Sequence, residues 1–361
     1  MKRPAGFKAE DYRSLPLESA VTLPAACYAD PEFHEFDRDA VFARSWQLVS
    51  RAEKLKDAGD HVVVEITGRP VILVRGDDQV LRGFFNVCRH RAGPLALVDG
   101  NGRQLQCKYH GWTYKLDGQL RAAHEMQQAK DFDISCIHLD PIKVAEWEGL
   151  VFAAVGEPEV PLDTLLAGIR ERIRPIDLGK FHFHSSLSYD VECNWKAYVD
   201  NYLEGYHLPH VHPGLNKLLD YRAYVTNLAE WYSHQHSPLD GAQGPYAAGE
   251  AHYYFIWPNM MLNILPGRLQ TNRVVPVSSR HCKVLFDYYY SDLGSPAAQK
   301  MIAEDLAFSD EVQREDMAIC ERVQKGLESG SYHAGRISPK RESGVHHFQE
   351  LVRAAYRQAS Q

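Results

Sequence analysis

Apolar and polar residues follow two different periods in the first half of the chain. Between residues 33 and 46 the apolar residues recur at near-helical spacing, which predicts a short amphipathic helix that docks on a larger body. From His61 to about residue 152 the chain is rich in Val, Ile and Phe and is interrupted by Gly- and Asp-containing turns, a pattern typical of short strands. The sequence therefore predicts a small antiparallel β module over residues 45–158, preceded by a segment, residues 1–44, that packs on the domain following the module.

The pattern changes again after a boundary near Gly156 to Pro158. Pro161 opens a predicted helix over residues 161–175, and strand-like and helical segments alternate beyond it. Strand-like composition covers residues 182–193, 222–233, 252–265, 268–277 and 281–291, and helical periodicity covers residues 194–206 and 297–328. This order indicates an α+β domain built on an antiparallel sheet, which we assign to residues 159–361.

Charge and cysteine content exclude several classes of protein. The 361 residues include 40 Lys and Arg against 47 Asp and Glu, and the net charge of −7 argues against a nucleic-acid-binding or anionic-membrane surface. No run approaches the roughly 18 apolar residues of a membrane span, and the first residues lack a signal-peptide core, so we expect a cytoplasmic protein. The seven scattered cysteines do not resemble a disulfide framework.

Two Cys/His pairs stand close together in the β module. Cys88-x-His90 is followed, after 16 residues, by Cys107-x-x-His110, and turn-forming glycines lie between the two pairs and directly after the second. Two thiolates and two imidazoles suit zinc, and they also suit a Rieske [2Fe–2S] cluster, in which two histidines replace two thiolates on one iron. A zinc finger would place a helix between its pairs. Because each pair here mixes Cys with His on a turn-rich loop, the pattern favours an iron–sulfur cluster.

A second set of candidate metal ligands follows the predicted helix 194–206. Pro209 ends that helix; His207 precedes the break, and His210 and His212 lie beyond it. Two histidines on either side of an irregular turn can converge on one ion, and a carboxylate would complete the 2-His-1-carboxylate triad of non-haem Fe(II) oxygenases. His207 therefore has two competing partners, His210 and His212.

The third ligand is expected from the predicted helix over residues 304–328. Its apolar stripe runs through Val312, Ile319, Cys320, Val323 and Leu327. Asp316 falls on that stripe, whereas Glu311 and Glu315 are expected to point to the side or to water. A buried carboxylate is costly unless it is paired or binds a metal, so Asp316 is the candidate ligand.

These motifs together resemble the Rieske non-haem iron oxygenases. The sequences CRHRAG and CKYHGWTYKLDG are similar to the family's C-x-H…C-x-x-H-G-W signature, and Glu204, His207 and His212 match its pattern E/D-x-x-H-x-x-x-x-H, which favours His212 over His210. The resemblance covers about residues 35–350 and implies a Rieske domain joined to a helix-grip-like catalytic domain. It implies one [2Fe–2S] cluster on Cys88, His90, Cys107 and His110, and one Fe(II) on His207, His212 and Asp316.

The resemblance also implies how the chain works. In this family O2 is the co-substrate, electrons come from NAD(P)H through a separate flavin/iron–sulfur reductase, and the subunits form a ring, commonly a homotrimer. A carboxylate passes electrons from the cluster of one subunit to the iron of its neighbour, and Glu204 occupies that position. Most ring-hydroxylating members have Asp there, whereas Glu is similar to the carnitine and related quaternary-ammonium oxygenases. No Gly-x-Gly-x-x-Gly element follows a strand, so we expect the nicotinamide to bind a separate protein.

The C-terminal half resembles the choline monooxygenase and glycine betaine oxygenase branch of this family. The similarity lies in the runs WPNMMLNILPGRLQTNRVVPV, KVLFDYYY and EDMAICERVQKGLESGSY. It implies hydroxylation of a quaternary ammonium compound, either choline oxidation or N-demethylation of a betaine or carnitine. Two alternatives remain: a Rieske oxygenase, monooxygenase or dioxygenase, that acts on an aromatic compound or aryl ether, and a non-enzymatic electron carrier or zinc module. The residues beyond Gly156 disfavour the last, because a carrier needs no second domain.

Aromatic residues supply candidates for the substrate pocket. Strand alternation places Tyr253, Phe255 and Trp257 on one face, and the predicted helix 194–206 brings Tyr202 and Tyr206. A trimethylammonium group has no hydrogen-bond donor, so a pocket recognises it by shape, by a carboxylate or by the faces of aromatic rings. We expect these rings to contribute to substrate binding.

Overall fold

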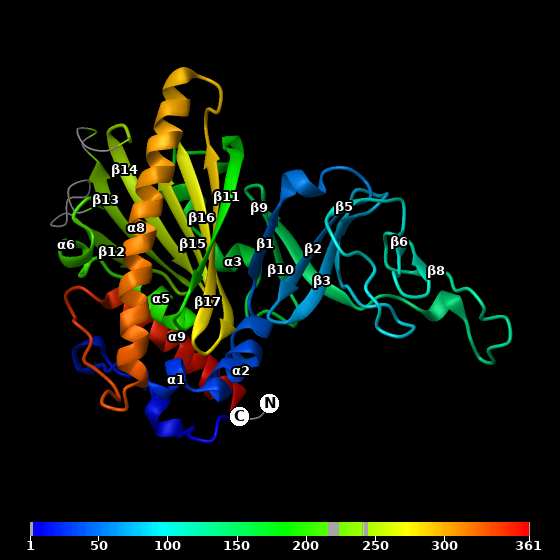
Figure 1. Cartoon of the computed structure of the whole chain (residues 1–361), viewed down its shortest axis with the longest axis horizontal. Coiled ribbons are helices and arrows are strands. Elements are labelled where there is room, and N and C mark those ends of the chain that lie inside the picture. Colours follow the sequence, from blue (N-terminus) through cyan, green and yellow to red (C-terminus); the bar gives the residue numbers. More distant parts are fainter. Residues whose placement is uncertain (1–2, 216–223, 240, 242–244, 361) are drawn as a thin grey trace. The chain divides into compact units, whose positions relative to one another are not determined.

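The structure, a computed structural model, describes residues 3–215, 224–239, 241 and 245–360. The chain divides into two compact units, coloured along the sequence in Figure 1. Phe42–Glu159 form the smaller unit, and Met1–Val41 together with Val160–Gln361 form the larger one. The first residues of the chain therefore belong to the same unit as its second half.

Antiparallel strands build the smaller unit. Its seven-stranded sheet has the order β1-β10-β9-β4-β3-β2-β5, and its three-stranded sheet has the order β6-β7-β8. The elements are η3 (Phe42–Arg44), β1 (Gln47–Arg51), η4 (Ala52–Leu55), β2 (Asp60–Ile66), β3 (Arg69–Arg75), β4 (Leu81–Phe85), β5 (Gly100–Asn101), β6 (Leu105–Gln106), β7 (Thr113–Tyr114), β8 (Leu120–Ala122), η5 (Ile134–Cys136), β9 (Pro141–Trp147) and β10 (Leu150–Ala154). One of its buried apolar clusters includes Cys88, Cys107 and Trp112, so both candidate thiolate ligands lie in the core of this unit.

A second seven-stranded antiparallel sheet forms the centre of the larger unit. Its order is β11-β17-β16-β15-β14-β13-β12, so the strands from β12 to β17 follow one another as a meander and β11 is added beside β17. The strands are β11 (His182–Val191), β12 (Val225–Leu228), β13 (Tyr232–Leu239), β14 (Gly249–Ile256), β15 (Met260–Leu265), β16 (Arg268–Ser278) and β17 (His281–Tyr290). The predicted α+β class with antiparallel sheets is confirmed.

Three helices pack on this sheet and frame the candidate site. The long helix α8 (Pro296–Glu328) runs along the strands, with α5 (Trp195–Tyr202) and α9 (Ser343–Ala359) near one end of the sheet (Figure 1). The remaining helices in the described part of the unit are η1 (Ala9–Tyr12), η2 (Leu17–Ser19), α1 (Ala26–Ala29), α2 (Pro31–Ala40), α3 (Leu162–Leu165), α4 (Ile169–Arg172), η6 (Leu178–Lys180) and α6 (Leu208–Val211). None of the helices in the described ranges is long and apolar enough to cross a membrane.

Local signals explain where α8 begins, but its inner face differs from the prediction. Ser295 caps the first turn, its Oγ accepting from the backbone N of Ala298 at 3.2 Å, and Pro296 takes the first helical position. Val323, predicted to be inward, is 46% exposed, and the neighbouring Gln324 is buried instead. The Gln324 side chain accepts a hydrogen bond from the backbone N of Asn194 at 2.9 Å. A polar residue thus takes a core position that apolar periodicity cannot detect.

Two other predicted elements are interrupted in the structure. The helix predicted over residues 161–175 is two short helices, α3 and α4, because Gly168 between them has a φ of +81° in the left-handed region. The strand predicted over residues 222–233 is β12 and β13 joined by a turn, and residues 222 and 223 lie outside the described residues.

A buried polar cluster fastens the N-terminal segment to the helices behind the candidate site. Asp37 on α2 is fully buried and accepts hydrogen bonds from Trp195 Nε1 at 2.8 Å, from Lys196 Nζ and from the hydroxyl of Tyr356. Because Trp195 and Lys196 open α5 and Tyr356 belongs to α9, one carboxylate joins three helices. Removing a partner from such a cluster would leave a buried group unsatisfied.

Candidate functional site

A tight turn after α5 brings two histidines close together, with one ring edge-on to the other. Asn194 caps α5, its side chain accepting from the backbone N of Lys196 at 3.0 Å. His207 and His212 flank the one-turn helix α6, and their rings lie 5.0 Å apart at 72°. His210, the competing candidate, is exposed, whereas His212 is 1% exposed. The structure therefore pairs His207 with His212.

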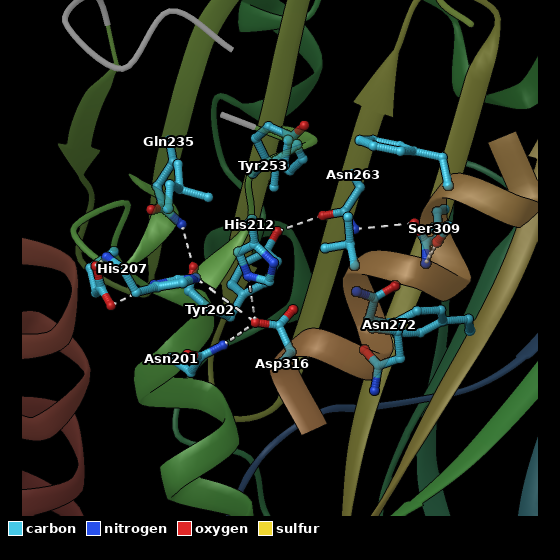
Figure 2. A pocket seen from close by; sticks show the side chains of 18 of the residues that line it. Asn201, Tyr202, His207, His212, Gln235, Tyr253, Asn263, Asn272, Ser309 and Asp316 are labelled. Atoms are coloured by element: carbon cyan, nitrogen blue, oxygen red, sulfur yellow. Dashed lines mark hydrogen bonds and ion pairs between the residues drawn. The ribbon is translucent and has the colours of Figure 1, made fainter. Parts of the chain in front are cut away.

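Asp316 reaches this pair from α8. Its Oδ1 lies 3.0 Å from His212 Nε2 and 3.8 Å from His207 Nε2 (Figure 2). The donor atoms of the three residues all lie within 4.8 Å of one another. Metal–ligand bonds of roughly 2.0–2.2 Å place neighbouring donors about 3–4 Å apart. Two imidazoles and one carboxylate in this arrangement fit the facial triad that holds non-haem Fe(II) and leaves positions open for O2 and substrate.

Each side chain of this triad has a hydrogen-bonding partner. Glu204 Oε1 lies 2.7 Å from His207 Nδ1, Glu315 Oε2 lies 2.7 Å from His212 Nδ1, and Asn201 Nδ2 donates to Asp316 Oδ1 at 2.6 Å. A carboxylate at Nδ1 fixes the tautomer of an imidazole and presents the lone pair of Nε2 to a metal. Burial opposes protonation of His212, but the carboxylates of Asp316 and Glu315 outweigh it and raise the pKa of His212.

Sequence reasoning missed Asn201 and was wrong about Glu315. Glu315 was expected to point to the side or to water, yet it bonds His212. Both of these adjacent α8 residues reach the same ring, Glu315 at Nδ1 and Asp316 at Nε2 of His212. A signal was present, because metal-binding histidines nearly always donate their second ring nitrogen to a carboxylate or carbonyl, and Glu315 is the nearest carboxylate to Asp316 in the sequence.

Glu204 bonds both the ring and the backbone of the turn that carries His207. In addition to its contact with Nδ1, its Oε2 accepts from the backbone N of His207 at 3.1 Å and from that of Tyr206. The side chain is only 11% exposed. Glu204 therefore fixes the orientation of the His207 ring through Nδ1, the nitrogen away from Asp316.

A pocket opens beside the triad, between the sheet, α5 and α8. Its floor includes an in-register row across four strands: Gln235, Tyr253, Asn263 and Gln270 (Figure 2). The other described lining residues are Tyr198, Asn201, Tyr202, Glu204, His207, Leu208, His212, Leu215, Tyr224, Tyr246, Arg268, Asn272, Phe286, Phe308, Ser309, Val312, Gln313 and Asp316. Polar side chains and tyrosine rings thus dominate its wall.

The predicted aromatic set is divided by the structure. Tyr202 and Tyr253 line the pocket, whereas Tyr206, Phe255 and Trp257 do not. Tyr206 is 49% exposed on the turn. Phe255 lies on the same sheet face as Tyr253, as predicted, but Phe348 of α9 packs on Phe255 at 5.4 Å and on Trp257 at 6.1 Å between ring centroids. Phe255 and Trp257 therefore belong to the core, and the prediction that they line the pocket was wrong.

The four Cys/His residues of the smaller unit occupy two loop tips. The Cys88 N donates to Gly93 O, and the Cys107 N donates to Trp112 O, both at 2.8 Å, which closes each tip. The His90 and His110 rings lie 4.7 Å apart, and His90 stacks on Trp112. His90 Nδ1 is buried with no hydrogen-bond partner among the described residues, as expected for a nitrogen that binds a metal.

The spacing of these donors fits two irons better than one zinc. Within the described part of the chain, only His207, His212 and Asp316 bring three donor atoms within 4.8 Å of one another. A single tetrahedral zinc would require the same of Cys88, His90, Cys107 and His110. A [2Fe–2S] cluster divides its four ligands between two irons, and Tyr114 OH, 3.2 Å from Cys88 Sγ, can donate to the cluster's thiolate.

Comparisons with known proteins agree with both sites. Residues 45–138 match the Rieske [2Fe-2S] domain, and residues 178–241 and 228–358 match the ring hydroxylating alpha subunit (catalytic domain). Choline monooxygenase of Arabidopsis thaliana is 37% identical, covering 94% of this chain and 83% of its own, and the carnitine monooxygenase oxygenase subunit of Escherichia coli is 31% identical, covering 96% and 97%.

Solved structures extend this agreement to the fold. A quaternary ammonium Rieske monooxygenase in complex with L-carnitine superposes with a TM-score of 0.83 at 28% identity, covering 95% of this chain and 99% of that one. A naphthalene 1,2-dioxygenase shares the fold at 17% identity and a TM-score of 0.77. The chain therefore belongs to the Rieske non-haem iron oxygenases, as a catalytic α subunit with a Rieske [2Fe–2S] cluster, a mononuclear iron and a separate reductase as its electron donor.

Proposed function

We propose that this oxygenase hydroxylates a quaternary ammonium compound, using O2 and electrons that a reductase takes from NAD(P)H. The observation that carries the proposal is the pocket beside the triad, where three of the lining tyrosines direct their hydroxyls to hydrogen-bond partners in the protein. Tyr202 OH donates to Asn263 at 2.6 Å, Tyr224 OH donates to Gln235 at 2.8 Å, and the Tyr246 hydroxyl donates to a buried carboxylate. Ring surfaces rather than hydroxyls are therefore left for the substrate.

Such a wall suits a trimethylammonium group. The methyl groups of this cation neither donate strong hydrogen bonds nor accept them, and each aromatic face in contact with it contributes about 0.5–2 kcal/mol. The names of the choline and carnitine monooxygenases and the carnitine complex support the same class of substrate. Hydroxylation of an N-methyl group would release formaldehyde, whereas hydroxylation of the alcohol carbon of choline would give an aldehyde hydrate.

The site residues divide the work in this proposal. His207, His212 and Asp316 would hold the Fe(II), and Cys88, His90, Cys107 and His110 would hold the cluster; together these groups supply stored electrons and O2 activation when bound. Asn201, Glu204 and Glu315 keep the three iron ligands in position through the hydrogen bonds described above. The pocket wall orients the C–H bond to be oxidised.

Electron delivery requires a second copy of the chain in this proposal. We place Glu204 between His207 and the partner subunit's His110, in a ring of three subunits. The hydrogen bond that Glu204 accepts from His207 Nδ1 supports this role, because it connects the iron ligand to a carboxylate that is still 11% exposed. Glutamate at this position also agrees with the carnitine-type branch.

A substrate panel tests the proposed function. Purified protein with a matched reductase, NAD(P)H and O2 is given choline, glycine betaine, carnitine, γ-butyrobetaine, benzoate and an aryl methyl ether. We expect O2 consumption coupled to formaldehyde or aldehyde with one or more of the ammonium compounds. Coupled turnover with benzoate or the aryl ether alone would replace this proposal with an aromatic substrate.

A further inference from the structure

The pocket beside the candidate iron site is long, and its two ends differ in charge. Asp305, Ser309, Gln313 and Asp316 follow one another along one face of α8 at intervals of three or four residues. The helix rises about 1.5 Å per residue, so Asp305 and Asp316 lie roughly 16 Å apart. The triad occupies the Asp316 end, and Arg268 occupies the Asp305 end.

Arg268 is the single Lys or Arg among the pocket-lining residues that the structure describes, and it is only 4% exposed. Its Nε lies 2.8 Å from Asp305 Oδ2, its Nη2 donates to Gln270 Oε1, and its guanidinium lies over the rings of Tyr246 and Tyr288 at 5.8 and 5.7 Å. A guanidinium has five N–H groups. Within the described residues Nη2 donates to Gln270, whereas Nε has no aligned hydrogen-bond acceptor despite its closeness to Asp305 and Nη1 has no hydrogen bond, so the guanidinium keeps N–H groups for a ligand in the pocket.

Asp305 holds the guanidinium in place. Its carboxylate is fully buried and accepts from the hydroxyls of Tyr246 and, at 2.6 Å, Tyr290, in addition to facing Arg268. With three partners it has little capacity to follow Arg268 or to bind anything else, so it acts as a positioning residue. A fixed guanidinium at a pocket wall matches the planar, forked geometry that carboxylates bind best.

We propose that Arg268 binds the carboxylate of the substrate, so that this chain acts on a trimethylammonium carboxylate, a zwitterion, in preference to a trimethylammonium alcohol. The inference rests on the proposed function. The tyrosine rings other than Tyr246, which lies against the Arg268 guanidinium, hold the cationic end beside the triad, and Arg268 holds the anionic end. Asp305 and Asp316 lie roughly 16 Å apart along α8, and the side chains at both ends take up part of this distance. The space left between them suits a substrate whose positive and negative charges are separated by several bonds.

Matched substrates distinguish a carboxylate-binding role of Arg268 from a purely structural one, in which its ion pair with Asp305 only joins α8 to the sheet. γ-Butyrobetaine and glycine betaine are each compared with their primary amides, which have the same shape and cationic end but no negative charge. For wild type we expect kcat/KM to favour at least one carboxylate over its amide by about 10- to 100-fold, mainly through KM, as for the loss of one charged hydrogen-bonding partner. Equilibrium binding, followed as the ligand-induced shift in Tm, should show the same order.

Variants then assign the preference to Arg268. Arg268→Gln should lower kcat/KM for the carboxylate substrate by a similar factor and leave kcat/KM for its amide nearly unchanged. Because that change leaves Asp305 without its cation, the double variant Arg268→Gln/Asp305→Asn removes both charges and keeps the buried pair neutral. Arg273→Gln is the matched control, since Arg273 lies on the same strand, β16, outside the pocket lining, and pairs with Asp287 at 3.7 Å.

The outcomes distinguish this inference from the function on which it rests. Equal use of carboxylate and amide by wild type, faster use of choline than of both carboxylates, or an undiminished carboxylate preference in the double variant would each overturn the role of Arg268 while the ammonium function stands. Failure of every ammonium compound in coupled turnover would overturn the function itself. Loss of the preference in both Arg268 variants, with wild-type behaviour in Arg273→Gln, establishes the carboxylate site.

Discussion

Each histidine of the candidate iron site is held by a carboxylate on the side away from the metal position. Glu204 lies at Nδ1 of His207 and Glu315 at Nδ1 of His212, so the Nε2 atoms of both rings are directed to Asp316. Supports of this kind control the affinity of a metal as strongly as they control geometry. The sequence could supply the ligand types and their spacing, but the rotation of α8 that aims Glu315 at His212 arises from tertiary packing.

Replacing Glu315 should weaken the iron site without touching the cluster. We expect Glu315→Ala to lower Fe(II) affinity by about 10- to 100-fold, because the His212 ring loses its orienting partner. Iron content after dialysis against a graded chelator measures the affinity, and visible absorption reports the cluster. Glu311→Ala, an exposed change on the same helix, is the control. Wild-type iron retention in Glu315→Ala would show that the contact does not support the ligand.

Tyr253 provides a test of the aromatic wall. Tyr253→Leu keeps an apolar side chain in the pocket but removes one ring, so binding of a trimethylammonium compound should weaken by about 0.5–2 kcal/mol. Binding of its neutral tert-butyl analogue should change less, and calorimetry with the two ligands measures the difference. Phe255→Leu is the comparison, since that ring packs on Phe348 and does not line the pocket. If Tyr253→Leu weakened the binding of both ligands equally, Tyr253 would make no cation–π contribution.

At the scale of elements, one face of the sheet in the larger unit is partly pocket wall and partly core. Tyr253 and Phe255 share one face, and strand alternation was sufficient to predict that. It could not show that α9, about a hundred residues later in the chain, covers Phe255 and Trp257 while leaving Tyr253 open to the pocket. Likewise, periodicity gave the position of the helix 297–328 but missed Gln324, because a buried amide with a backbone partner has no apolar signature.

Two buried histidines, His234 on β13 and His252 on β14, form a pair within the same sheet. His234 Nε2 lies 3.0 Å from His252 Nδ1, and the His234 ring stacks on Tyr254 at 4.3 Å. Burial, together with His252, His236 and Arg172, lowers the pKa of His234 to about 3, and burial lowers that of His252. In the unfolded chain both titrate near 6.5.

This pair should make the fold sensitive to acid. Between about pH 6.5 and pH 3 the unfolded chain binds a proton at His234 that the folded chain does not, so the free energy of unfolding falls as the pH falls, by at most about 1.4 kcal/mol per pH unit for one histidine. We expect the Tm of His234→Gln to fall less than that of wild type between pH 7 and pH 5. His182→Gln, an exposed change on β11, should follow wild type. Parallel pH profiles for all three proteins would contradict the assignment.

At the scale of the whole molecule, the candidate iron and cluster sites belong to different compact units. In the proposed ring, electrons leave the cluster of one subunit and reach the iron of the next through Glu204. Short motifs supplied the four cluster ligands and the two histidines, and the apolar stripe of a distant helix supplied Asp316. Nothing in one chain supplies the second subunit, so the bridge depends on the assembly.

Glu204 and hybrid rings test that bridge together. Glu204→Ala removes the orienting partner of His207, so the variant is reconstituted with excess Fe(II); it should then carry both metals and a reducible cluster but lose nearly all turnover. Cys107→Ser and Asp316→Ala should each be inactive alone, the first lacking the cluster and the second the iron. Rings assembled from a mixture of these two variants should regain part of the activity, because an intact cluster then adjoins an intact iron. Inactive rings whose mixed composition is verified by mass spectrometry would exclude transfer between subunits.

The cluster around Asp37 also sets an order of events during synthesis. Phe42–Glu159 leave the ribosome as one continuous stretch, and this unit can fold and acquire its cluster early. Asp37, in contrast, gains its hydrogen bond from Tyr356 only after another 319 residues have been synthesised. At about 5–20 residues per second, that delay lasts roughly 15–60 s. We therefore expect a nascent chain to be red-brown before the unit that holds the mononuclear iron has folded, because synthesis of α9 is the step that completes this unit.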